Sequence, residues 1–130
     1  EKALTLSIVK DGEAIFETIS HGISGFLEAI KQHGKNLKGA SVADRIAGKA
    51  IALLCVYAKV KAVYAVTLSI EGRNVFEKHA VYHEWDNLVE NILDVNKMAK
   101  CPFERLATGI SDSKEAYKKL EALQKSLRSC

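Results

Sequence analysis

Three groups of residues in this sequence have the type and spacing to do chemistry. In the first, Cys101 stands directly before Pro102 and three residues before Glu104, which predicts a thiol at the start of a helix. A helix dipole at that position favours the thiolate, so Cys101 is a candidate nucleophile. The alternative is that Cys101 is a small buried residue and Pro102 simply occupies the first helical position.

The second group is Ser41, Asp44, Arg45 and Lys49. The pattern predicts a helix over 41–57, with Ser41 as its N-cap and Asp44 in the acidic capping position. Free backbone N–H groups and two nearby cations would make this helix start a candidate phosphate site. The alternative is an ordinary helix start, in which Asp44 only complements the helix dipole.

The third group, Ser69, Glu71 and Asn74, lies where a strand gives way to a helix. Residues 60–70 are rich in β-branched side chains, which is typical of a parallel strand covered on both faces. A short helix over 71–79 is predicted to follow. The alternative for Glu71 and Asn74 is ordinary helix-start polarity, because glutamate is common in a first turn without any role.

The residues around these groups predict a mixture of strands and helices. Alternating apolar residues over 4–9 and an apolar run over 14–16, joined by a turn, indicate a β-hairpin. Apolar residues spaced by three and four over 26–33 indicate a helix. A strand over 80–83, a helix over 87–97 and a helix from Cys101 and Pro102 complete the predicted order β-β-α-α-β-α-β-α-α, which ends in a C-terminal helix.

The C-terminal helix, over about 112–128, carries an apolar stripe of Ala116, Leu120, Leu123 and Leu127. The spacing is heptad-like, but two heptads are too few to predict a coiled coil. The stripe therefore predicts packing on the domain, with a homodimer through this helix as the alternative.

Composition predicts one folded domain over 1–130, because 48% of its 130 residues are hydrophobic and one is proline. Three widely spaced cysteines, Cys55, Cys101 and Cys130, do not form a disulfide framework, and no membrane span or signal peptide is found, so a cytoplasmic location is expected. Residues 97–130 carry 8 basic and 4 acidic side chains, yet no dense basic cluster with interleaved aromatics occurs, so nucleic acid is not an expected partner.

Two stretches resemble motifs of bacterial cytidine deaminases. Residues 42–47 resemble the Cys-Ala-Glu-Arg helix start, in which the cysteine ligates zinc and the glutamate shuttles protons. Residues 67–75 resemble the Ser-Pro-Cys-Gly-x-Cys motif, which carries the other two ligands. On this resemblance Val42, Glu71 and Asn74 stand at the ligand positions, and Asp44 stands at the glutamate position.

These substitutions predict that the chain is not a zinc-dependent deaminase. Such a site needs three soft or imidazole ligands and an open position for water. Valine offers no donor atom, and the oxygens of Glu71 and Asn74 suit harder cations. No His-x-Glu or Pro-Cys-x-x-Cys sequence occurs elsewhere, so neither zinc nor another cofactor is expected.

The order of elements, with Asp44-Arg45, Gly48-Lys49 and Cys101-Pro102 followed by Glu104, also resembles a small bacterial family of unknown function. The resemblance implies the α/β class: a three-layer α-β-α, cytidine deaminase-like fold, with a mixed sheet of four to five strands and helices on both faces. It also implies a cleft between the starts of two central helices, across which Asp44 and Glu71 face each other. Two close carboxylates could raise one pKa or hold a divalent cation.

Three hypotheses of function follow. The leading one is a zinc-free domain that binds a small anionic, nucleotide-like ligand in this cleft. The second is a zinc-independent enzyme that uses Asp44, Glu71 or Cys101, and the third is an assembly role through the C-terminal helix. The residues expected to bind the ligand are Ser41, Asp44, Arg45, Lys49, Ser69, Glu71 and Asn74.

Overall fold

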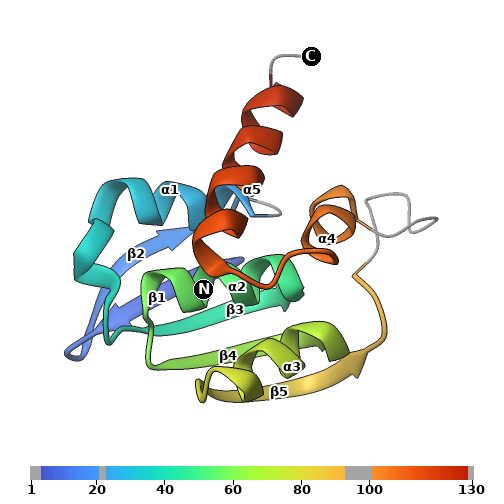
Figure 1. Cartoon of the computed structure of the whole chain (residues 1–130). Helices are drawn as coiled ribbons and strands as arrows, with labels where there is room; N and C mark the ends of the chain where they lie inside the picture. The colour runs from blue at the N-terminus through green and yellow to red at the C-terminus, as the bar shows by residue number, and fades with distance from the viewer. Residues whose placement is uncertain (1–3, 21–22, 93–100, 129–130) are drawn as a thin grey trace.

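The computed structural model describes residues 4–20, 23–92 and 101–128. Five strands and five α-helices, with one 3₁₀ helix, follow one another along this part of the chain (Figure 1). They are β1 (Leu6–Lys10), β2 (Glu13–Thr18), α1 (Ser24–His33), the 3₁₀ helix η1 (Gly34–Leu37), β3 (Ser41–Ala47), α2 (Lys49–Ala58), β4 (Ala62–Ser69), α3 (Ile70–Lys78), β5 (Tyr82–Val89), α4 (Pro102–Ala107) and α5 (Ser113–Arg128).

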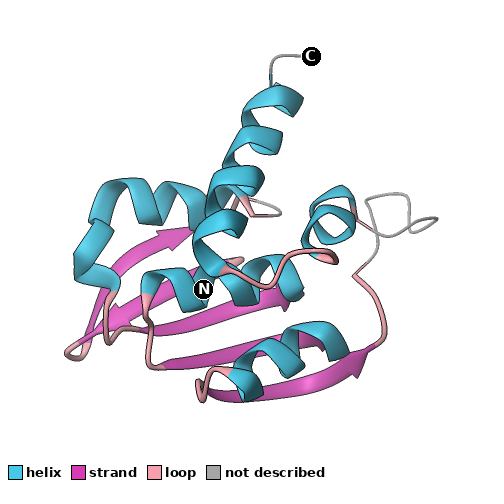
Figure 2. Ribbon diagram, in the orientation of Figure 1, coloured by secondary structure: helices cyan, strands magenta, loops and turns pink. Residues whose placement is uncertain are grey.

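The strands form one mixed sheet in the order β2-β1-β3-β4-β5 (Figure 2). β1 pairs antiparallel with β2 and with β3, whereas β3, β4 and β5 are parallel. Parallel neighbours require a crossover, and α2 and α3 supply the two crossovers here. The expected α/β class and mixed sheet are confirmed.

The core lies between one face of the sheet and the helices. Ile8, Val42 and Val63 stand opposite one another on adjacent strands and are buried, as are six consecutive residues of α2, Ala50 to Cys55. The opposite face exposes Tyr64 and Val66 of β4. Helices were expected on both faces of the sheet. In the described part of the chain they cover one face instead (Figure 1).

The prediction of a helix over 41–57 was wrong in its first half. Ser41–Ala47 is the strand β3, which pairs with β1 on one side and with β4 on the other. Its small and apolar residues resemble a buried helix segment as closely as a buried strand, so periodicity alone could not separate the two. Because the segment pairs with a strand on each side, it forms a strand rather than a helix. The helix α2 begins only at Lys49, after Gly48.

The prediction around β5 was also partly wrong. This strand is Tyr82–Val89 rather than 80–83, because seven of its eight residues, all but Asp86, have a partner on parallel β4. The helix predicted over 87–97 therefore begins inside a strand, and residues 93–100 lie outside the described residues. The predicted hairpin and the helices that begin near residues 24, 70, 102 and 113 are confirmed.

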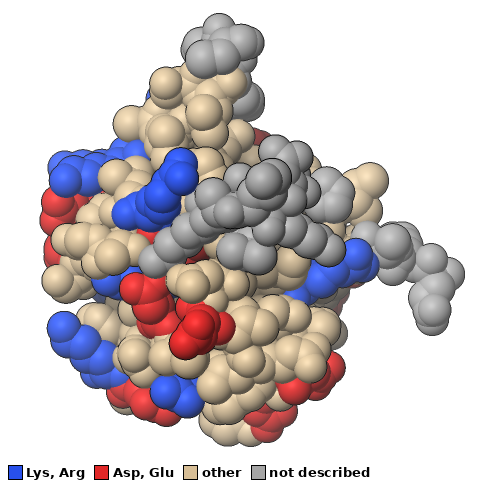
Figure 3. All heavy atoms as spheres, turned by 90° about the vertical axis from the view of Figure 1, so that its right-hand side faces the viewer, with Lys and Arg blue, Asp and Glu red and all other residues tan. Residues whose placement is uncertain are grey.

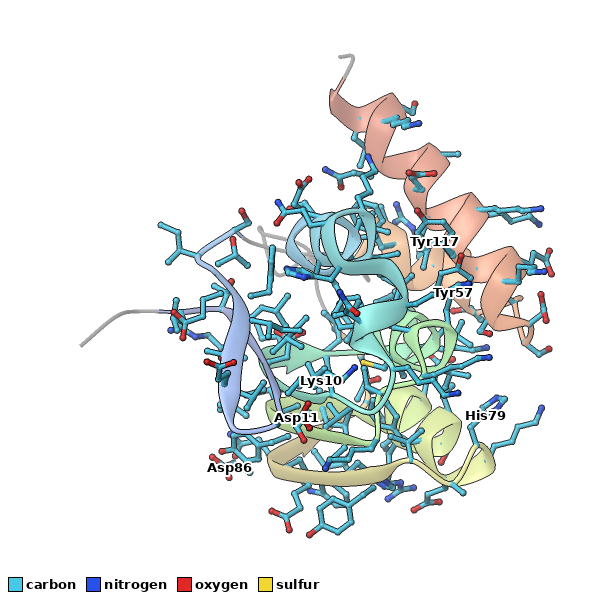
Figure 4. The ribbon with its side chains drawn as sticks, turned by 90° about the vertical axis from the view of Figure 1, so that its left-hand side faces the viewer. Lys10, Asp11, Tyr57, His79, Asp86 and Tyr117 are labelled. Carbon is cyan, nitrogen blue, oxygen red and sulfur yellow. The ribbon has the colours of Figure 1, made fainter. Side chains whose placement is uncertain are left out.

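The apolar stripe of α5 packs on the domain at its N-terminal end. Ala116 and Leu120 are fully buried, and Tyr117 stacks on Tyr57 of α2 with ring centroids 4.5 Å apart (Figure 4). Leu127, at the far end of the helix, is 47% exposed. Packing on the domain, the first of the two predicted alternatives, thus accounts for the first half of the stripe.

Candidate functional site

A cavity of about 310 Å³ lies between α2 and α3. This volume is at the small end of the range for ligand pockets. Three of the seven residues predicted to bind ligand meet here: Lys49, Glu71 and Asn74. The full lining is Lys49, Leu53, Glu71, Asn74, Val75, Lys78, His79 and Ser111.

The wall that α3 contributes follows from helical spacing. Glu71, Asn74, Val75 and Lys78 are related by steps of three, one and three residues, so they share one face of the helix. His79 follows directly after the last residue of α3 (Figure 4). Glu71 and His79 are eight residues apart, which is about 12 Å along a helix axis. The wall therefore offers a carboxylate and an amide toward one end and two basic side chains at the other.

Ser69 has a local structural role rather than a place in the lining. It is buried, and its hydroxyl Oγ accepts a hydrogen bond of 3.0 Å from the backbone N–H of Gly72, which caps α3. A capping serine of this kind contributes about 1 kcal/mol to helix stability. Ser69 thus ends β4 and starts α3, and so orients Glu71 and Asn74.

The wall that α2 contributes consists of Lys49 and Leu53, one turn apart. The Nζ atom of Lys49 donates a 3.0 Å hydrogen bond to the backbone carbonyl of Thr108, which follows α4. Ser111, three residues further along, completes the lining. The cavity is therefore built from α2, α3 and the connection between α4 and α5.

A buried carboxylate occupies the start of α2. Glu104 of α4 is only 4% exposed, and its Oε1 and Oε2 atoms accept hydrogen bonds of 2.8 and 3.1 Å from the backbone N–H groups of Lys49 and Ala50. These are the N–H groups that a bound anion would use at a helix start. At α2 the protein's own side chain already occupies that position.

Sequence reasoning noted Glu104 near the start of the helix after Cys101 and as part of a family resemblance, but gave it no role of its own. The signal that could have found its role is Gly48, the residue before α2, where a glycine leaves room for a neighbouring group. A second close approach lies beside it, because a Cβ on Gly72 would stand 3.0 Å from the carbonyl carbon of Gly48. These two glycines hold the starts of α2 and α3 close together, next to the cavity.

Ser41, Asp44 and Arg45 do not line the cavity, because they belong to β3. Arg45 is exposed, and its Nη2 atom donates a 3.1 Å hydrogen bond to the carbonyl of Leu4. Asp44 is half-buried between β1 and β4, opposite Leu6 and Ala65. Burial raises the pKa of its carboxyl to about 7, although hydrogen bonds from the backbone of Ile46 and Arg45 lower it in part.

The correction of β3 also removes Val42 and Asp44 from the helix start at which the resemblance placed them. Both belong to the sheet, and Gly48 and Lys49 stand at the start of α2 instead. The second resembling stretch keeps its expected place, because Ser69 ends β4 and Glu71 lies in the first turn of α3. Asp44 and Glu71 therefore do not share the cavity.

The two described cysteines lie outside the cavity lining. Cys101 is half-buried at the N-cap of α4, where its side chain makes no capping hydrogen bond. Cys55 is fully buried in α2, and burial first, then the charge of Asp44, raise the pKa of its thiol well above the usual range. Of the three candidate catalytic residues, Asp44, Glu71 and Cys101, only Glu71 lines the cavity.

Three further observations concern partners, metal ions and membranes. Basic and acidic side chains are interspersed among uncharged residues on the face of the molecule seen in Figure 3. Over residues 4–20, 23–92 and 101–128, no three His, Cys, Asp or Glu residues gather as a metal ion would require. None of the helices in the same ranges has the length and apolar character needed to cross a membrane.

Two solved structures are similar to this fold. A crystal structure of a DUF1893 family protein, TM1506 from Thermotoga maritima, is 25% identical, covers 92% of this chain and 80% of that chain, and superposes with a TM-score of 0.85. A diaminohydroxyphosphoribosylaminopyrimidine deaminase/5-amino-6-(5-phosphoribosylamino)uracil reductase from the same organism is 19% identical over 62% of this chain and 28% of that chain, with a TM-score of 0.50. The second likeness shows a deaminase-like fold alone.

Sequence comparison agrees with the first of these structures. No curated protein matches the chain. The family described as a domain of unknown function, DUF1893 (TM1506), matches residues 1–123. The resemblance to a family of unknown function with a deaminase-like fold is thereby confirmed, and the chain belongs to the DUF1893 family.

Proposed function

We propose that this protein binds a small anionic, nucleotide-like ligand in the cavity between α2 and α3. The observation that carries the proposal is the charge of the lining, in which two lysines, Lys49 and Lys78, outnumber one carboxylate, that of Glu71. Lysine ammonium groups are strong partners for phosphate oxygens. Cations gathered around one concave site attract an anion from solution as well as holding it.

The arrangement of the lining suggests how such a ligand lies. Its charged group would contact Lys78 and His79 at one end of the α3 wall. The amide of Asn74 both donates and accepts hydrogen bonds, and the carboxylate of Glu71 accepts them, so these two suit the polar edge of a heterocycle. Leu53 and Val75 provide the apolar surface between the walls.

The proposal differs in one respect from the binding mode expected from sequence. A ligand phosphate cannot use the first N–H groups of α2, because the carboxylate of Glu104 is bonded to them. Side chains along the cavity therefore replace the helix start as the anion-binding groups.

As part of the same proposal, the protein functions in a reducing compartment such as the cytoplasm. The free thiols of Cys55 and Cys101 support this part of the proposal.

A binding experiment with a charge-reversal variant tests the proposal. Isothermal titration of the protein with inorganic phosphate and a panel of nucleoside monophosphates should give saturable binding, and bound ligand should raise the melting temperature. Lys78→Glu should weaken binding at least about tenfold, because it places a carboxylate where the phosphate binds.

The matched control is Lys38→Glu. Lys38 is an exposed lysine that follows η1 and does not line the cavity, so reversal of its charge should leave affinity unchanged. The proposal is wrong if no member of the panel binds, or if the two lysine variants bind alike.

A further inference from the structure

We infer that Glu104 is a positioning residue of the α2–α3 cavity: it fixes the segment 104–111 on the start of α2, and so holds Lys49 and Ser111 in the cavity wall. The inference rests on the proposed function for its effect on ligand binding. Its structural part stands independently, on six hydrogen bonds and on the space left by Gly48.

The first two hydrogen bonds hold the carboxylate. A carboxylate that is only 4% exposed is costly unless its oxygens are bonded. Both oxygens of Glu104 accept from the first turn of α2, at Lys49 and Ala50, where the helix dipole also favours negative charge. The side chain is thus held as a bound anion would be, although it comes from a helix 54 to 55 residues away in sequence.

The next contacts return from the end of α4 to the same lysine. The backbone carbonyl of Glu104 accepts hydrogen bonds from the N–H and the hydroxyl of Thr108, at 3.0 and 2.9 Å. The carbonyl of Thr108 in turn accepts the bond from Nζ of Lys49. The turn from Glu104 to Thr108 therefore holds Lys49 at two points: Glu104 bonds its backbone N–H, and Thr108 bonds its side chain.

Ser111 reaches the cavity through the same segment. Ala107, directly before Thr108, and Ile110, directly before Ser111, are both buried. The N–H of Ile110 donates a 2.9 Å hydrogen bond to the carbonyl of Ala107, so the chain turns there. Docking of Glu104 therefore determines where both Lys49 and Ser111 stand, while Glu104 itself is not part of the lining.

The test compares Glu104→Ala with Leu37→Ala. Leu37 is fully buried in η1, outside the cavity, so its truncation destabilises the protein without touching Lys49. In the intact protein and both variants, the rate of acetylation of Lys49 is measured by brief treatment with acetic anhydride and peptide mass spectrometry, with exposed Lys38 as internal standard. Glu104→Ala should raise this rate about tenfold, because without the charge-assisted hydrogen bonds of Glu104 the Lys49 ammonium loses its fixed partner at Thr108. Leu37→Ala should not raise it.

Chemical rescue separates positioning from general destabilisation. Formate carries the carboxylate that the alanine variant lacks, so it should slow both the acetylation of Lys49 and the hydrogen exchange of the Lys49 and Ala50 amides in Glu104→Ala toward wild-type rates. It should have no effect on Leu37→Ala. If Glu104→Ala does not fold, Glu104→Gln, which keeps the shape and one acceptor, takes its place and should show the same increase in acetylation.

Ligand binding provides the last measurement. Affinity for inorganic phosphate should fall about tenfold in Glu104→Ala and stay unchanged in Leu37→Ala. If the intact protein binds neither phosphate nor a nucleotide, the proposed function fails, and the acetylation rates still decide the positioning role. The positioning role itself is overturned if Lys49 reacts equally in the two variants, or if formate changes both alike.

Discussion

Gly48 and Glu104 meet at the start of α2, where a Cβ on residue 48 would lie 2.4 Å from both the Cδ and the Oε1 atoms of Glu104. No real Cβ makes so short a contact, so the carboxylate can occupy this position only beside a glycine. The glycine is needed here for space rather than for its conformation, because its φ of −115° is open to any residue. The contact links α4 to α2, the crossover between β3 and β4.

Gly48→Ala should therefore destabilise the protein by about 2 to 4 kcal/mol. The new methyl group displaces the carboxylate of Glu104, which loses its hydrogen bonds to α2 while remaining partly buried. Urea denaturation followed by circular dichroism measures the change. Gly109→Ala is the control, because a Cβ there meets no atom within 4 Å, and it should cost less than about 0.5 kcal/mol.

The pair can also be tested together. Glu104→Ala removes the group that a Cβ at residue 48 would strike, so the double variant Gly48→Ala, Glu104→Ala should be more stable than the sum of the two single changes predicts. Simple additivity in the double variant would show that the clash at Gly48 involves some other group.

Asp44 should make stability fall as pH rises through the weakly acidic range. Its pKa is raised to about 7 in the folded protein by burial, whereas in an unfolded chain it is about 3.9. The folded state therefore binds the proton more tightly, so the contribution of protonated Asp44 is complete below about pH 4 and is lost as the pH approaches 7.

Asp44→Asn should abolish this fall, because the amide stays neutral. We expect the variant to match the wild type near pH 4 and to exceed its free energy of unfolding by about 2 to 4 kcal/mol at pH 8. Urea titrations at a series of pH values measure the slope, and Asp11→Asn, in the exposed turn of the hairpin, controls for the change in net charge. If the free energy of unfolding changed with pH in the same way for the wild type and for Asp44→Asn, the burial of the Asp44 charge would be contradicted.

Tyr57 and Tyr117 should be coupled across α2 and α5. Their rings are stacked with an interplanar angle of 5°, a geometry worth about 1 kcal/mol beyond the area buried. A double-mutant cycle with alanine at each position should give a coupling energy of about 0.5 to 1.5 kcal/mol. No coupling would mean that α5 is not held on the domain at this point.

The cysteines should differ in their reaction with iodoacetamide. Cys55 is fully buried, and burial raises the pKa of its thiol, so it should react only when the protein unfolds. Half-buried Cys101 should react in the native protein, at a rate no greater than that of glutathione. Peptide mass spectrometry distinguishes the two sites, and faster reaction of Cys101 would revive the hypothesis that it is a nucleophile.

Much of the fold could be predicted because local patterns determined it. Alternation identified the hairpin, β-branched residues identified β4, Pro102 identified the start of α4, and the apolar stripe identified α5. β3 was missed because its identity depends on pairing with β1 and β4, and no short stretch of sequence contains that information. That one error placed Asp44 at a helix start, whereas in the structure it lies in the sheet.

The candidate site was predicted less completely. Lys49, Glu71 and Asn74 were found because they stand next to element boundaries, where polar side chains are conspicuous. Lys78 lies seven residues after Glu71, about two turns along the same face of α3, so this spacing could have identified it once α3 was predicted. Glu104 could not be placed, because its partners at the start of α2 are more than fifty residues away.

β5 ends the sheet, since among the described residues it pairs with β4 alone. The free backbone groups of such a strand invite a strand of another molecule to add to the sheet and begin an aggregate. Exposed carboxylates at Glu84 and Asp86 lie within this strand, so a second β5 approaching it would bring like charges opposite each other. These two carboxylates thus disfavour the pairing of two copies of the protein through β5.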